Sequence, residues 1–131
     1  MRNSFLLAML LALFAISAPI GSAETVVEKH RARITYYHDG LRTASGVKPR
    51  TGITVAAHPK FKFGSKVRIP QLEGKIGDDG FFIVQDRGSA VTSRKASGGK
   101  TEVIDVYVSS NKELRRMAST MPRYMDILVY K

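Results

Sequence analysis

Short apolar runs with strand-like alternation recur along residues 24–131, and Gly, Pro or Asp residues bound most of them. Successive side chains of a β-strand point to opposite faces, so this pattern predicts strands with one buried face. These 108 residues contain no cysteine, so the fold must rest on its hydrophobic core alone. The pattern favours one closed β domain. The predicted strands span residues 28–37, 53–57, 65–69, 81–85, 102–108 and 123–130.

Two of the connecting segments are long and polar. Residues 38–52 contain three Gly and one Pro, which predicts a long loop. Residues 88–101 are rich in Ser, Gly and Lys and are predicted to form a flexible excursion between two strands. In the turn after the second strand, Phe61 and Phe63 are expected to cover one end of the core.

One short helix is predicted after the fifth strand. Ser110 and Glu113 have the spacing of a capping box, in which each side chain bonds a backbone N–H at the start of a helix. The helix is expected to run to about Ala118, with Leu114 and Met117 facing the core.

The first 23 residues have the pattern of a secretory signal peptide. Arg2 is followed by an apolar run from Phe5 to Ile20 and by the small residues 21–23. We expect cleavage before Glu24, with an uncleaved N-terminal anchor as the alternative. No cysteine follows the run to carry a lipid anchor. We therefore expect an exported, soluble protein, periplasmic or secreted, with one domain over residues 24–131.

The chain is strongly basic. Its formal net charge is +10, and it falls to +9 without Arg2. A basic exported domain is expected near polyanions, although a high charge can also serve solubility alone. The basic residues are scattered, with no helical Arg stripe and no aromatic RNA-binding motif, so we expect no nucleic acid partner.

Asp86 and Asp105 are the candidate functional residues because each interrupts an apolar strand. A charge in such a strand is costly unless it is paired, hydrogen-bonded or used. Alternation puts Asp105 on one face with Val103 and Tyr107, where partial burial raises a carboxyl pKa. A carboxyl that keeps its proton near neutral pH can donate it to a glycosidic oxygen. His58, before Pro59, is the third candidate.

Structural roles remain open for each of the three. Asp86 can bond loop amides or pair with Arg87, Asp105 can be a satisfied structural carboxylate, and His58 can cap a turn. The three histidines show no metal-ligand spacing, and we expect neither a metal nor a cofactor. The sequence also contains no phosphate-binding glycine loop and no nucleophile elbow.

Six short motifs in order resemble the rare lipoprotein A family, and they extend the resemblance over residues 32 to 130. That family has an all-β fold, a six-stranded double-psi β-barrel, so the resemblance implies this barrel with one short helix here. The motifs are Ile34-Thr35-Tyr36-Tyr37, Thr43-Ala44-Ser45-Gly46, Thr54-Val55-Ala56-Ala57-His58-Pro59, Phe63-Gly64-Ser65-Lys66-Val67-Arg68-Ile69, Gln85-Asp86-Arg87-Gly88 and Ile104-Asp105-Val106, with Gly40 between the first two.

The chain is also similar to the three-aspartate domain of membrane-bound lytic transglycosylase A. Asp86 and Asp105 match two of its three aspartates, and His58 stands at the first. The resemblance implies that Asp86, Asp105 and His58 form the catalytic site, with the acid at Asp105 or Asp86. It implies that Tyr37, Ser45 and Arg87 contact the substrate.

The implied partner is the glycan strand of peptidoglycan, and we expect a monomer. The implied reaction is a non-hydrolytic cut between N-acetylmuramic acid and N-acetylglucosamine, which needs one carboxylate acid/base. The alternative is a non-catalytic, expansin-like polysaccharide-binding module. Val47 follows Ser45-Gly46 where the family usually has an acidic residue, and residues 89–101 form a longer, more basic loop than is typical.

Overall fold

The computed structural model describes residues 27–131, so the predicted signal peptide at residues 1–23 lies outside the described residues. Six strands form one sheet, in the order β1-β5-β2-β4-β3-β6, and β6 also pairs with β1 so that the sheet closes on itself. The strands are β1 (Val27–Tyr37), β2 (Thr54–Ala56), β3 (Lys66–Arg68), β4 (Phe81–Asp86), β5 (Glu102–Tyr107) and β6 (Tyr124–Tyr130).

Two of the strand pairs are parallel, namely β1 with β5 and β2 with β4, and the other four are antiparallel. The six predicted strands are confirmed, and none of their ends differs from the prediction by more than one residue. The structure is mostly β with few helices, which is consistent with the predicted all-β class.

The core fills the inside of the closed sheet. Alternate residues of each strand point inward, as the sequence pattern predicts, and most outer residues are polar or partly exposed, with the buried Ala56 and Val103 as exceptions. The buried inner residues include Ala32, Ile34, Val55, Val67, Phe82, Val84, Ile104, Val106, Met125, Ile127 and Val129.

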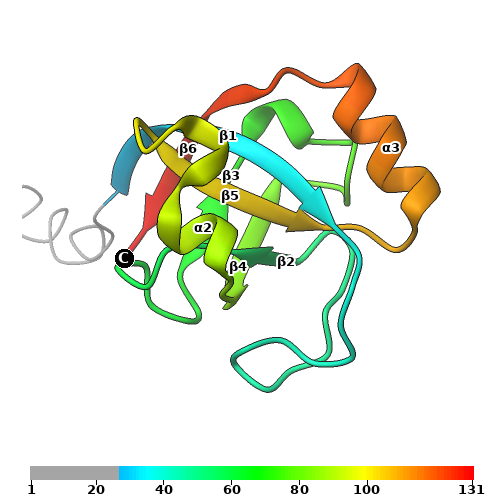
Figure 1. Ribbon diagram of the computed structural model, residues 1–131, viewed down its shortest axis with the longest axis horizontal. Coiled ribbons are helices and arrows are strands. Elements are labelled where there is room, and N and C mark those ends of the chain that lie inside the picture. The colour runs from blue at the N-terminus through cyan, green and yellow to red at the C-terminus, as the bar shows by residue number, and fades with distance from the viewer. Residues whose placement is uncertain (1–26) are drawn as a thin grey trace, which may run out of the picture.

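Helix α3 (Asn111–Thr120) confirms the predicted inner face and the Ser110 half of the predicted capping box, while the Glu113 carboxylate accepts from Arg116 instead. The Ser110 hydroxyl accepts a hydrogen bond from the backbone N–H of Glu113 at 3.1 Å. Met117 is fully buried, and Leu114 packs partly against the core. Figure 1 shows α3 at one end of the molecule and the loop of residues 38–53 projecting away from the strands.

The prediction of a single helix is wrong, because residues 88–101, predicted to form a flexible excursion, contain a second helix. This segment contains helix α2 (Ser89–Ser93) and a 3-10 turn at Lys95–Ser97. Val91 of α2 is buried against Ala56 and Val103, on the outer face of the sheet. One apolar side chain in a polar segment shows no helical period, which is why the sequence pattern missed it. A further 3-10 turn spans Pro70–Leu72.

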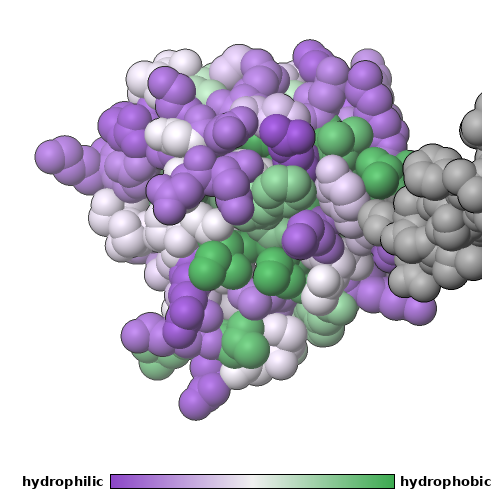
Figure 2. Space-filling model, turned by 180° about the vertical axis from the view of Figure 1, so that it is seen from behind, coloured by the Kyte–Doolittle hydropathy of each residue, from purple (hydrophilic) through white to green (hydrophobic). Residues whose placement is uncertain are grey.

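The two phenylalanines of the turn after β2 behave differently. Phe61 is buried in the core, as predicted, but Phe63 is 44% exposed, so the prediction is wrong for Phe63. The guanidinium of Arg87 lies 4.0 Å from the centre of the Phe63 ring, so Phe63 makes a cation–π contact at the surface. Figure 2 shows that the back face is mainly hydrophilic, with apolar residues gathered near its centre.

Candidate carboxylate site

The sheet register brings Asp86 and Asp105 to opposite sides of one residue of β2. Ala56 pairs with Asp86 of β4 on one side and with Asp105 of β5 on the other. Neighbouring strands lie about 4.8 Å apart, so the two aspartate backbones are separated by about 10 Å. The β2–β4 register shifts between Val55 and Ala56, and this irregularity sets Asp86 opposite Ala56.

Both oxygens of Asp86 accept hydrogen bonds. Oδ1 accepts from the backbone N–H of Ala44 at 2.8 Å and from that of Arg87 at 2.9 Å. Oδ2 accepts from the Tyr37 hydroxyl at 2.7 Å. The loop is held at the same place by a bond from Ser45 N–H to the Gln85 carbonyl at 3.1 Å. Asp86 therefore ties the 38–53 loop to the end of β4.

Tyr37 covers the outer face between the two aspartates. It packs against the cluster of Ala56, Val91 and Val103, and its ring meets Tyr107 edge-on at 5.5 Å. Burial raises the pKa of the Tyr37 hydroxyl, and the bond to Asp86 raises it further. Tyr37 thus stays a neutral hydrogen-bond donor beside an acceptor carboxylate.

Asp105 has a different environment. Its one side-chain partner is the Thr35 hydroxyl, which donates to Oδ1 at 2.9 Å from the neighbouring strand β1. Burial raises the pKa of Asp105 to about 6, the Thr35 bond opposes the rise, and the charge of Asp86 adds to it. Asp105 therefore holds a proton at weakly acidic pH, well above the pH at which an ordinary aspartate loses it.

His58 lies on the turn that follows β2. Its Nδ1 accepts a hydrogen bond from the backbone N–H of Lys60 at 3.0 Å. The backbone carbonyl of His58 accepts one from the backbone N–H of Phe61 at 2.9 Å. Nε2 is left for another partner. In the described part of the chain no hydrogen bond or ion pair joins His58 to Asp86 or Asp105.

The three expected substrate contacts lie around Asp86. Tyr37 bonds it directly, and Ser45 is exposed on the loop, with its hydroxyl 3.0 Å from that of Thr43. Arg87 is engaged instead with the turn after β2, because its guanidinium donates to the carbonyls of Phe61 at 2.8 Å and Ala57 at 3.4 Å. Burial lowers the pKa of Arg87.

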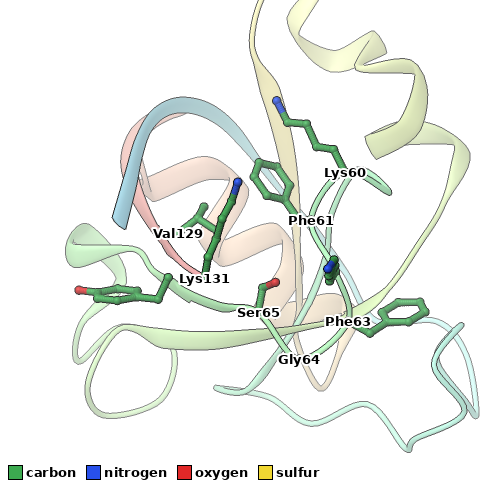
Figure 3. Close-up of a pocket in the computed structure, with 9 residues that line it drawn as sticks. Lys60, Phe61, Phe63, Gly64, Ser65, Val129 and Lys131 are labelled. Atoms are coloured by element: carbon green, nitrogen blue, oxygen red, sulfur yellow. The ribbon is translucent and has the colours of Figure 1, made fainter. Parts of the chain in front are cut away.

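Neither aspartate lines the cavity of about 450 Å³ that residues 60–65 and 129–131 form. Figure 3 shows Lys60, Phe61, Val129 and Lys131 lining it. We place the candidate site at the aspartates because their common pairing with Ala56 and the raised pKa of Asp105 are features that cavity size does not reflect.

Two parts of the site were missed by the sequence patterns. Thr35 shares the outer face of its strand with Arg31 and Arg33, but only the parallel register of β1 and β5 shows that it meets Asp105. The backbone N–H of Ala44 belongs to a loop whose path carries no periodic signal.

Over residues 27–131 we find no group of three or more His, Cys, Asp or Glu side chains placed to hold a metal ion. The helices in this range are all too short or too polar to cross a bilayer. Comparison of the chain with models of protein families, with curated proteins and with solved structures finds no match in any of the three.

Proposed function

We propose that this protein is an exported cell-wall protein that binds peptidoglycan glycan strands and cleaves them as a lytic transglycosylase. The observation that carries the proposal is the pair of unlike carboxyls around Ala56. Asp105 has a pKa of about 6. Asp86, on the other side of Ala56, accepts hydrogen bonds from three donors. Support also comes from the ordered motifs of the rare lipoprotein A family.

In the proposed reaction Asp105 is the general acid. It gives its proton to the glycosidic oxygen between N-acetylmuramic acid and N-acetylglucosamine as the bond from that oxygen to the anomeric carbon breaks. The muramic acid's own hydroxyl then forms a new bond to the anomeric carbon and loses its proton to the Asp105 carboxylate. No water is consumed, and the acid returns to its starting state.

The other site residues have supporting roles in this proposal. The charge of Asp86 adds to the effect of burial, which chiefly raises the pKa of Asp105, and Asp86 holds the loop that carries Ser45. Tyr37 covers the face between the two carboxyls, which limits solvent at Asp105. His58 supplies a free Nε2 for the glycan, and the basic surface attracts the anionic peptide stems.

The finer fold belongs to the same proposal. We infer a double-psi β-barrel, and the closed order of six strands with two parallel pairs is compatible with it. A fold alone does not determine an activity, so the carboxyl chemistry is the argument for catalysis.

A non-catalytic wall-binding module is the second candidate, and one observation favours it. Two of the three hydrogen bonds to Asp86 have a structural result, since they join the end of β4 to β1 and to the 38–53 loop. Val47 stands where the resembling family usually has an acidic residue, which leaves one fewer carboxyl near this loop.

The test is to incubate the purified protein with isolated sacculi and to search for anhydro-muropeptides by mass spectrometry. The proposal predicts product from the parent and from Asp78→Asn, an exposed turn residue that serves as the matched control. Asp105→Asn should give none. Sacculus binding without product at any pH between 4 and 8 would instead establish the binding module.

A further inference from the structure

A second polar site lies at the start of β5, where basic side chains from three other segments surround an open cavity. The cavity has a volume of about 400 Å³. Its lining combines residues of β1, the turn after β2, the end of the α2 excursion and the start of β5, namely His30, Arg31, Lys60, Arg94, Gly99, Lys100, Thr101 and Glu102.

The lining has a large excess of positive charge. Four of its side chains are cationic, Arg31, Lys60, Arg94 and Lys100, and one, Glu102, is anionic, so with neutral histidine the net charge is +3. Like charges gathered around one concave surface repel one another unless a counter-charge occupies it. The cavity is therefore suited to an anion.

The single acid orients two of the cations and does not neutralise the site. Glu102 is 7% exposed, and its carboxylate pairs with Nε of Arg94 and, at 2.7 Å, with Nζ of Lys60. Burial acts to raise the pKa of Glu102, but the contacts with Arg94 and Lys60 outweigh it, so the pKa lies below its ordinary value. The terminal nitrogens of Arg94 remain as donors.

The backbone at Arg94 is itself unusual. Arg94 has φ 54° and ψ 30°, and among residues 27–131 it is the one non-glycine with a positive φ. A side chain in this left-handed conformation costs about 1 kcal/mol or more, and such residues cluster at functional sites. Here the conformation ends α2 and directs the side chain to Glu102 in the cavity.

The other two cations are not required by Glu102. Arg31 meets only Asp126, at 3.4 Å and with both side chains more than half exposed, and such exposed pairs contribute little. Lys100 has no acidic partner among the described residues. These two side chains and Arg94 are the groups free to meet a ligand.

We propose that this cavity, formed around Arg31, Arg94 and Lys100, binds a phosphate group. A net charge of +3 matches a dianion better than a monoanionic carboxylate, and guanidinium groups bind phosphate oxygens through paired hydrogen bonds. The volume exceeds that of a bare ion and admits a phosphorylated small molecule or a phospholipid headgroup. Glu102 lies three residues before Asp105, about 10 Å along β5, so this site is separate from the carboxylate site.

The experiment measures binding by the purified protein at physiological salt. Glycerol 3-phosphate is titrated by calorimetry, with acetate as the carboxylate probe, and phosphatidylglycerol vesicles are compared with phosphatidylcholine vesicles by sedimentation. The test variant is Arg31→Gln/Lys100→Gln. Lys112→Gln/Arg115→Gln, on exposed positions of α3, is the control because it removes the same two charges.

The proposal predicts that glycerol 3-phosphate binds more tightly than acetate, and that the test variant binds about tenfold more weakly than the control variant. If only phosphatidylglycerol vesicles bind, with the same difference between the variants, the phosphate belongs to a lipid headgroup. Equal weakening in both variants, or no binding of either phosphate probe, would overturn the proposal.

Discussion

The Tyr37 hydroxyl donates a hydrogen bond to Oδ2 of Asp86 at 2.7 Å, although β5 and β2 lie between their strands in the sheet. The tyrosine reaches across the outer face over Ala56 and Val103. This one contact links the end of β1 to the end of β4 and to the loop that Asp86 holds.

Tyr37→Phe removes the donor to Oδ2 and should lower the free energy of unfolding by about 1–3 kcal/mol, the cost of a partly buried acceptor left without its partner. Tyr107→Phe is the matched control, because its ring packs on Tyr37 but its hydroxyl does not bond Asp86. Urea unfolding of both variants measures the difference. Equal losses would show that the bond to Asp86 contributes nothing beyond the general effect of removing a tyrosine hydroxyl.

Asp105→Asn should stabilise the protein at high pH. Because the pKa of Asp105 rises from 3.8 to about 6 on folding, its favourable contribution is complete below about pH 3.8 and is lost as the pH passes through 6. At pH 8 the buried charge costs up to about 3 kcal/mol, at about 1.4 kcal/mol per pKa unit. Asparagine removes that cost and can still accept from Thr35.

Thermal and urea unfolding at pH 4 and pH 8 measure this effect. Asp105→Asn should be more stable than the parent at pH 8 and close to it at pH 4. The exposed Asp78→Asn should show no such change with pH. A variant that is destabilised equally at both pH values would mean that Asp105 is held ionised by partners.

Val91→Ala tests whether α2 is packed in solution. Val91 is 1% exposed, and its loss from the outer cluster should cost about 1–2.5 kcal/mol. Thr92→Ala, at the exposed neighbouring position, should have little effect. Unfolding curves that coincide for the two variants would support the flexible excursion that the sequence pattern predicts.

Gly52 and Gly77 meet where the 38–53 loop returns to the sheet. A Cβ on Gly52 would lie 2.9 Å from the Gly77 Cα, and the φ of Gly52 is +83°. Gly52→Ala should therefore cost the strain of a left-handed residue, about 1–2 kcal/mol, together with a backbone displacement. Gly64→Ala, with φ +89° and open space around it, isolates the strain alone.

Unfolding free energies of these two glycine variants give the comparison. Gly52→Ala should be the less stable of the two by more than 1 kcal/mol. If Gly64→Ala loses as much, the contact between the two glycines has no consequence of its own.

The strands and the inner faces could be predicted from the sequence because alternation is local. The inward positions of Ile104 and Val106, and the outward position of Asp105, follow from spacing within one strand. The hydrogen-bond partners of Asp86 and Asp105 do not follow from spacing within one strand. Thr35 meets Asp105 and Tyr37 meets Asp86 only after the sheet closes, and pairing between distant strands leaves no periodic trace in either segment.

The most direct test of the account is the titration of the Asp105 carboxyl, followed by carbon NMR with Asp105→Asn used for assignment. The expected midpoint is near pH 6, because burial and the charge of Asp86 both favour the protonated form. A midpoint near pH 4 or below would contradict it, since Asp105 would then hold no proton to give to a glycosidic oxygen at neutral pH.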